Sequence, residues 1–154
     1  MAKFNLEFPT QVIKDIERIY DNADEIFGEM TRAGAEVVER NIRENAPDTI
    51  KSYVRKSKTY KTPSDDGINT KTYISGYMPF SGNRSSFTAK GGNGTKYTTT
   101  KGVPADFVAK IYEYGRSSAP FPKHPFLRKS FKKKEIEEAM LNAQKKLSGG
   151  LLDE

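Results

Sequence analysis

The sequence predicts an α+β protein, in which a long N-terminal helix and a C-terminal helix pack on an antiparallel sheet of three or four strands. Three observations support this class: a helical apolar period at each end of the chain, alternating apolar residues between the ends, and turn-forming residues separating the alternating stretches. A chain of 154 residues, of which 35% are apolar, is long enough for one core. We therefore expect a single domain spanning residues 1–154.

The N-terminal helix is predicted from apolar residues that are spaced alternately by four and three. Further apolar residues stand beside them every seven positions. Three apolar positions in seven form a stripe wider than a coiled-coil seam, which favours burial against a sheet over a free coiled coil. The stripe comprises Val12, Ile16, Ile19, Ala23, Ile26, Met30, Ala33 and Val37, accompanied by Ile13, Tyr20, Phe27 and Gly34.

The boundaries of this helix follow from local signals. Thr10 is suited to cap its start, and the helix should end at Ala46-Pro47, since the residue before a proline avoids the helical region. Asn22 with Glu25 resembles an internal capping box. The apolar register passes through that point unshifted, so we expect one helix with a kink in preference to two helices.

The middle of the chain changes to the pattern of strands and turns. A half-exposed strand is predicted from Ile50, and Pro63–Gly67 has strong turn chemistry. A second strand is expected over Ile68–Tyr77. Residues 79–104 are rich in glycine, serine, threonine and lysine, which predicts a long flexible loop.

A third strand and a closing helix are expected in the remainder of the chain. Residues Phe107–Tyr114 alternate like a strand, and a helix is predicted from about Phe126 to Leu147. The tail, residues 148–154, is expected to be disordered. The predicted apolar face of the closing helix consists of Phe131, Ile136, Ala139, Met140, Ala143 and Leu147.

Charge is distributed unevenly along the chain, although the formal net charge is +6. Residues 49–134 contain 18 basic and 4 acidic residues, whereas residues 1–48 contain 6 basic and 11 acidic residues, and residues 135–154 are also acidic. This asymmetry is consistent with a nucleic-acid surface, or with a subunit whose acidic helix meets the basic face of its neighbour. Charge alone leaves both interpretations open.

The sequence offers no catalytic, cofactor-binding or metal-binding set of residues. The absence of cysteine excludes disulfides, thiol nucleophiles and thiolate metal sites. His124 is the only histidine and lies between prolines, and the glycines around Gly91–Gly94 lack the spacing of a phosphate-binding loop. We therefore expect no enzyme activity and no cofactor. The remaining enzymatic reading is a toxin-like or nuclease protein without recognisable catalytic residues.

Targeting signals and membrane spans are also missing from the sequence. No apolar run approaches the roughly 18 residues of a membrane span, and residues 1–7 do not resemble a secretory signal. We therefore expect no membrane partner and a location in the cytoplasm.

A basic stretch with interleaved tyrosines supports an alternative function. Such a pattern is typical of a nucleic-acid surface, so the alternative is a small basic nucleic-acid-binding protein. No recognised nucleic-acid-binding motif accompanies it. The residues are Lys51, Arg55, Lys56, Lys58 and Lys61, with Tyr53 and Tyr60 between them.

The most specific stretch lies between residues 108 and 131. An aromatic residue, a glutamate, one further residue and a glycine precede a turn with prolines, which leads to Pro-Phe-Leu-Arg and a helix. This pattern resembles the siphophage gene-product-ten-like family of tail-component proteins. The resemblance extends to the end of the N-terminal helix at Ala46-Pro47, where the family commonly has Ala-Pro. The family then commonly starts its first strand with Thr-Gly-x-Leu, whereas this chain has Thr49–Tyr53 without the glycine. The matching positions are Tyr112, Glu113, Gly115, Pro125, Phe126, Leu127 and Arg128.

The resemblance implies a structural virion assembly protein at the phage head–tail junction, a neck or tail-completion component that forms a ring. It implies a homo-oligomer in the virion, which can remain monomeric in isolation, and other head-connector and tail proteins as partners. Contact with DNA should be weak and non-specific at most. The expected locations are the virion and, during assembly, the cytoplasm of the host bacterium. The seven motif positions are the expected family motif and subunit interface.

The motif also has a direct physical interpretation. Gly115 can adopt positive φ where the chain turns sharply, and the prolines stiffen the connection to the last helix. Phe126 and Leu127 should anchor the start of that helix. A carboxylate such as Glu113 in so basic a region should pair with a cation, either within the subunit or across an interface.

Overall fold

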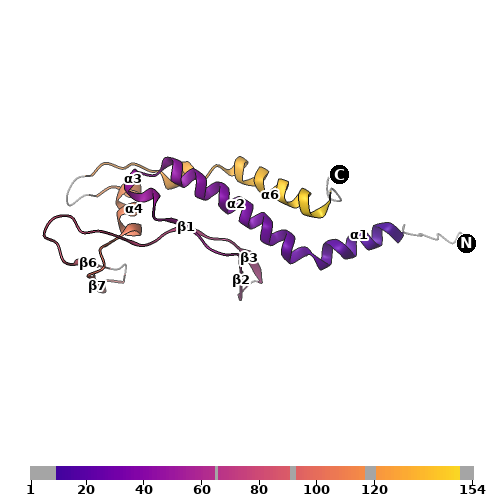
Figure 1. Ribbon diagram of the computed structural model, residues 1–154, viewed down its shortest axis with the longest axis horizontal. Coiled ribbons are helices and arrows are strands. Elements are labelled where there is room, and N and C mark those ends of the chain that lie inside the picture. Colours follow the sequence, from indigo (N-terminus) through magenta and orange to yellow (C-terminus); the bar gives the residue numbers. More distant parts are fainter. Residues whose placement is uncertain (1–9, 65, 91–92, 117–120, 150–154) are drawn as a thin grey trace, which may run out of the picture.

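The computed structural model describes residues 10–64, 66–90, 93–116 and 121–149 (Figure 1). The helices are α1 (Thr10–Asp21), α2 (Ala23–Asn45), α3 (Asp48–Lys51), α4 (Ala105–Tyr114), α5 (Leu127–Ser130) and α6 (Lys133–Ser148). The strands are β1 (Val54–Lys56), β2 (Tyr60–Thr62), β3 (Gly67–Asn69), β4 (Thr72–Ile74), β5 (Tyr77–Met78), β6 (Phe87–Lys90), β7 (Lys96–Thr99) and β8 (Val103–Pro104). The α+β class is therefore confirmed.

Helix α2 is the axis of the molecule, with α6 along one side and strands β1, β3 and β4 along the other (Figure 1). Gly34 permits the close approach of α6, because a Cβ atom at this position would lie 3.1 Å from Met140 Cγ. On the strand side, Thr72 Oγ1 donates a hydrogen bond to Ala35 O at 3.2 Å. The two layers thus use different faces of one helix.

The structure has two helices, α1 and α2, in place of the single expected N-terminal helix, and they meet at an angle at Asn22, the position of the expected kink. Asn22 has φ −102° and ψ 9°, which separates α1 from α2. Its side-chain amide donates to Arg18 O at 2.8 Å, so the side chain bonds back to the preceding turn and does not cap α2. The capping box suggested by Asn22 and Glu25 is therefore not formed. Thr10, the residue expected to cap this end, is the first residue of α1, and the residues before it lie outside the described ranges, so its capping role stays a prediction.

The core lies where the C-terminal end of α2 meets α3, β1, α4 and α5. Ile50 and Val54 are 0% exposed, and Phe126 is 3% exposed. Partly buried side chains surround this cluster. Its buried members are Ile42, Ala46, Ile50, Val54, Ala109 and Phe126.

The strands form two-stranded antiparallel pairs, in place of the expected single sheet of three or four strands. Among the described residues, β1 pairs with β4, β2 with β3, β5 with β8, and β6 with β7. The turn chemistry of residues 63–67 is confirmed, because it joins β2 to β3 with Thr62 opposite Gly67. The second predicted strand is divided into β3, β4 and β5. The first begins at Val54, since Ile50 belongs to α3.

The predicted strand at Phe107–Tyr114 is wrong, because this segment is helix α4. Ala105, Ala109 and Glu113 are its buried residues, and their spacing of four is helical. An acidic residue in the first turn and a glycine after the last helical residue are typical helix boundaries. In so short a segment the apolar residues fit the period of a strand and that of a helix. Burial of residues four positions apart, at Ala105, Ala109 and Glu113, favours the helix.

The expected loop at residues 79–104 contains secondary structure. Strands β6 and β7 form a hairpin, and β8 returns to pair with β5. The rings of Phe87 in the hairpin and Phe107 in α4 meet edge-to-face, with centroids 5.0 Å apart. The mobility of this segment remains a prediction.

The predicted C-terminal helix is interrupted between α5 and α6. Phe131 has φ −86° and ψ 77°, ends α5 and is 66% exposed, so its assignment to the buried face is wrong. The other predicted apolar positions of this helix are partly buried. Helix α6 continues to Ser148, which is 2% exposed, and residues 150–154 of the expected tail lie outside the described ranges.

Candidate functional site

The side chain of Glu113 connects α4 to the start of α5. Its Oε2 accepts hydrogen bonds from the backbone N–H groups of Phe126 at 2.9 Å and Leu127 at 3.0 Å. Its Oε1 accepts a hydrogen bond from Arg128 Nε at 3.0 Å. The Glu113 side chain is 1% exposed. A buried carboxylate thus caps the free N–H groups of α5 and pairs with a cation of the same chain.

The hydrogen bonds stabilise the ionised form of Glu113. Burial is the largest single effect and by itself raises the pKa of this carboxyl. The hydrogen bonds from Leu127, Arg128 and Phe126 together outweigh burial, so the pKa of Glu113 is lowered from its ordinary value. Glu113 is therefore an anion near neutral pH.

The connection between α4 and α5 folds back onto Tyr112. Tyr112 O accepts a hydrogen bond from His124 N at 2.8 Å, and the rings of Tyr112 and Phe121 meet edge-to-face at 5.1 Å. Gly115 has φ +78°, and a Cβ atom there would lie 2.9 Å from Phe121 O. Positive φ at Gly115 is therefore confirmed, and both conformation and space require glycine.

The outer side of this motif is exposed. The side chain of Arg128 is 70% exposed, and its guanidinium lies over the ring of Tyr114 at 5.6 Å from the centroid. Tyr114 is 61% exposed. The structure thus brings the seven motif residues together, with Glu113 and Phe126 inside. A role in contacts between subunits remains a prediction for the outer residues.

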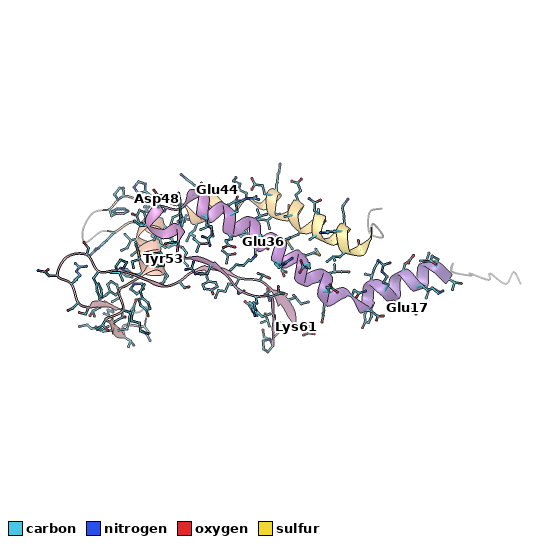
Figure 2. The ribbon with its side chains drawn as sticks, viewed as in Figure 1. Glu17, Glu36, Glu44, Asp48, Tyr53 and Lys61 are labelled. Carbon is cyan, nitrogen blue, oxygen red and sulfur yellow. The ribbon has the colours of Figure 1, made fainter. Side chains whose placement is uncertain are left out.

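Within the described part of the chain, three basic side chains from its middle form ion pairs with acidic residues of its N-terminal part. Lys56 Nζ lies 2.6 Å from Glu36 Oε1, and Lys51 Nζ lies 2.7 Å from Asp48 Oδ1. Lys61 on β2 forms an ion pair with Asp24 of α2. Figure 2 shows Glu36 on the long helix and Lys61 on the strands beneath it. Acidic and basic parts of the sequence thus meet within one subunit at these three pairs.

Helix α1 presents a large exposed apolar surface, although its apolar period predicts burial. Figure 1 shows α1 projecting from α2 at an angle, beyond the end of α6. No residue of α1 is buried. Ile16 is 61% exposed, Tyr20 81%, and Phe27, at the start of α2, 53%. The apolar period identified these residues, but in the folded subunit no other described element covers them.

The remaining candidates do not form a chemical site. Among residues 10–64, 66–90, 93–116 and 121–149, no three of the His, Cys, Asp and Glu side chains are placed to hold a metal ion. His124 is exposed, and its ring meets that of Phe121 edge-to-face with centroids 5.8 Å apart. In the same described part of the chain, no helix is long and apolar enough to cross a membrane.

The comparisons with known proteins point to one family. The profile of the family described as "Bacteriophage HK97-gp10, putative tail-component" matches residues 10–115. The match includes Tyr112, Glu113 and Gly115, and it ends before the Pro-Phe-Leu-Arg segment at residues 125–128. No curated protein and no solved structure matches the chain.

Proposed function

Because the chain belongs to the HK97-gp10-like family of bacteriophage tail components, we propose that it is a structural protein of the virion that acts at the head–tail junction. There it completes the neck or the tail end as a ring of identical subunits and binds the neighbouring connector and tail proteins. It carries out no catalysis and holds no cofactor. Its site of action is the virion, which it joins in the cytoplasm of the host bacterium.

The observation that carries this proposal is the exposed apolar side of α1. A lone soluble subunit gains nothing from exposing Ile16 at 61% and Tyr20 at 81%, whereas a protein that works by binding other subunits requires such a surface. These side chains lie on α1, an amphipathic helix of which no residue is buried. The surface therefore fits an assembly protein better than a monomeric binding protein.

The test is the phenotype of a phage that lacks the gene. We expect filled heads and separate tails that fail to join, and we expect a plasmid copy of the gene to restore joined particles. Electron microscopy of the lysate distinguishes joined particles from separate heads and tails. Normal infectious particles without the gene product would contradict the proposal, and loss of tails altogether would move the protein from the junction to tail elongation.

Binding to nucleic acid distinguishes the assembly function from the nucleic-acid alternative. If the protein is an assembly protein, contact of its exposed basic side chains with DNA should be weak, independent of sequence and strongly reduced by salt. Filter binding at two salt concentrations measures this. Tight and sequence-dependent binding at physiological salt would favour the alternative over the assembly function.

A further inference from the structure

We propose that the apolar stripe of α1 docks into a groove on a second copy of this chain, bounded by α2, α6 and the β3–β4 segment. The inference rests on the proposed assembly function and identifies the surfaces that join one subunit to the next. The stripe consists of Val12, Ile13, Ile16, Tyr20 and Phe27, which are all exposed.

The stripe belongs to the apolar period of the long helix, but it is not covered by α6. Ile13, Tyr20, Phe27 and Gly34 are spaced by seven residues, and Gly34 is where α6 packs closely, against Met140. The end of α6 does reach α1, because a Cβ atom at Gly149 would lie 3.5 Å from the Arg18 guanidinium, on the side of α1 away from the stripe. The positions of the stripe at Ile13, Tyr20 and Phe27 are nevertheless exposed. A helix face built for packing is therefore left without a partner within the subunit.

The groove lies on α2 close to the end of the stripe. Its floor includes Gly34 and Val38, and Phe131, Ile136 and Met140 contribute its apolar wall. Phe131 is 66% exposed, so this wall also lacks a cover within the subunit. Each copy therefore carries both an uncovered apolar helix face and an uncovered apolar groove.

Charge favours the groove, over a second α1 helix, as the surface that receives the stripe. With 3.6 residues per turn, Asp15 and Glu17 border the two edges of the stripe, whereas Lys14 and Arg18 lie on the opposite side. Pairing of two α1 helices would bring acidic edges together, which is unfavourable. The groove is lined by Lys71 and by no carboxylate, and no carboxylate of the described residues pairs with Lys71.

The geometry of the contact agrees with a ring. The stripe and the groove are different surfaces, so the contact is heterologous, and each new subunit again offers both surfaces. Such a contact continues from subunit to subunit until a rotation closes it. An isologous contact between two stripes would stop at a dimer.

Cysteine cross-linking tests the contact directly, because the chain contains no cysteine. A tagged Ile16→Cys chain and an untagged Phe131→Cys chain are mixed and oxidised, as purified protein and in particles assembled in infected cells. We expect a disulfide-linked pair of one tagged and one untagged chain. The matched control, Lys14→Cys with Phe131→Cys, places the first cysteine on the opposite side of α1 and should remain at background.

Two results would overturn the inference. One is linkage of Ile16→Cys chains only to each other, which would show paired α1 helices, and the other is the absence of the mixed pair in joined particles. In both cases complementation by unmodified protein would still leave the proposed function intact. Conversely, if the mixed pair forms but a phage from which the gene is deleted still joins heads and tails, the function is refuted and the contact is retained.

A second measurement separates association from folding. Ile16→Gln should reduce the oligomer to monomer or fail to complement, while its melting as a monomer stays unchanged because Ile16 contacts little within the subunit. Lys14→Gln, exposed on the opposite side, should behave as the unmodified chain. Equal assembly by both variants would contradict the docking of the stripe.

Discussion

Glu113 and Arg128 form an ion pair in which one partner is inside the protein and the other outside. The Glu113 side chain is 1% exposed and that of Arg128 is 70% exposed, and the distance from Nε to Oε1 is 3.0 Å. Glu113 also holds the backbone N–H groups of Phe126 and Leu127. Loss of Glu113 should therefore cost more stability than loss of Arg128, because the exposed Arg128 guanidinium can bind water in place of the carboxylate.

Replacing Glu113 by glutamine should destabilise the subunit. The amide keeps the shape but loses charge assistance, and its NH₂ group faces the donor of Arg128, so we expect a loss of about 1–3 kcal/mol in the free energy of unfolding. Glu137→Gln on the exposed face of α6 is the control and should change it by less than about 0.5 kcal/mol. Urea unfolding measures both, and equal stability of the two variants would show that the Glu113 carboxylate does not stabilise the fold.

The contribution of Glu113 should depend on pH in the acid range. Its pKa is lowered in the folded protein, so its stabilisation is fully present above the pKa of glutamate in the unfolded chain. That stabilisation is lost as the pH falls through the lowered folded value. The difference in unfolding free energy between the unmodified chain and Glu113→Gln should therefore be largest near neutral pH and shrink below about pH 4.5. A constant difference down to about pH 2 would contradict this linkage.

Gly115→Ala should be costly, and Gly28→Ala provides the matched comparison. At Gly115 the backbone has φ +78° and the new Cβ would meet Phe121 O at 2.9 Å, so a loss of about 1–3 kcal/mol is expected. Gly28 is inside α2, and its new Cβ would make only an ordinary contact with Thr59 at 3.6 Å. Alanine there should stabilise by about 0.5–1 kcal/mol. Thermal melting of the two variants should thus shift in opposite directions.

Two phenylalanines five residues apart should respond differently to truncation. Phe126 is 3% exposed in the core, and Phe126→Ala should cost about 3–5 kcal/mol in unfolding free energy. Phe131 is 66% exposed, and Phe131→Ala should change the stability of the monomer by less than about 0.5 kcal/mol. Because Phe131 lines the proposed docking groove, its variant should instead weaken association. A large loss of monomer stability for Phe131→Ala would show that its ring packs within the subunit.

The segment at residues 79–104 should be mobile in the isolated subunit and ordered in the assembly. Strands β6 and β7 are mostly exposed, and the ring of Phe87 against Phe107 is their main aromatic contact with α4. We expect fast amide hydrogen exchange at Phe87–Lys90 and Lys96–Thr99 relative to α2, and slower exchange in assembled particles. Protection equal to that of α2 in the monomer would refute this prediction.

Several local features were determined by the sequence alone. The apolar period identified the long N-terminal helix, Pro47 its end, and residues 63–67 the turn of a hairpin. The glycine at 115 indicated a sharp turn with positive φ. Each depends on interactions between neighbours in the chain, such as the fixed φ of proline or the freedom of glycine, so the residues themselves contain the information.

Only the tertiary structure decided which surfaces are covered. The segment from Ala105 to Tyr114 became a helix because Ala109 and Glu113 are buried one turn apart, although its sequence also alternates like a strand. Glu113 finds its donors 13 to 15 residues later, across a turn whose path the sequence does not specify. Ile16 belongs to the same apolar period as the packed part of α2, yet it is 61% exposed. Burial is a property of two surfaces that meet, and a periodic pattern describes only one of them.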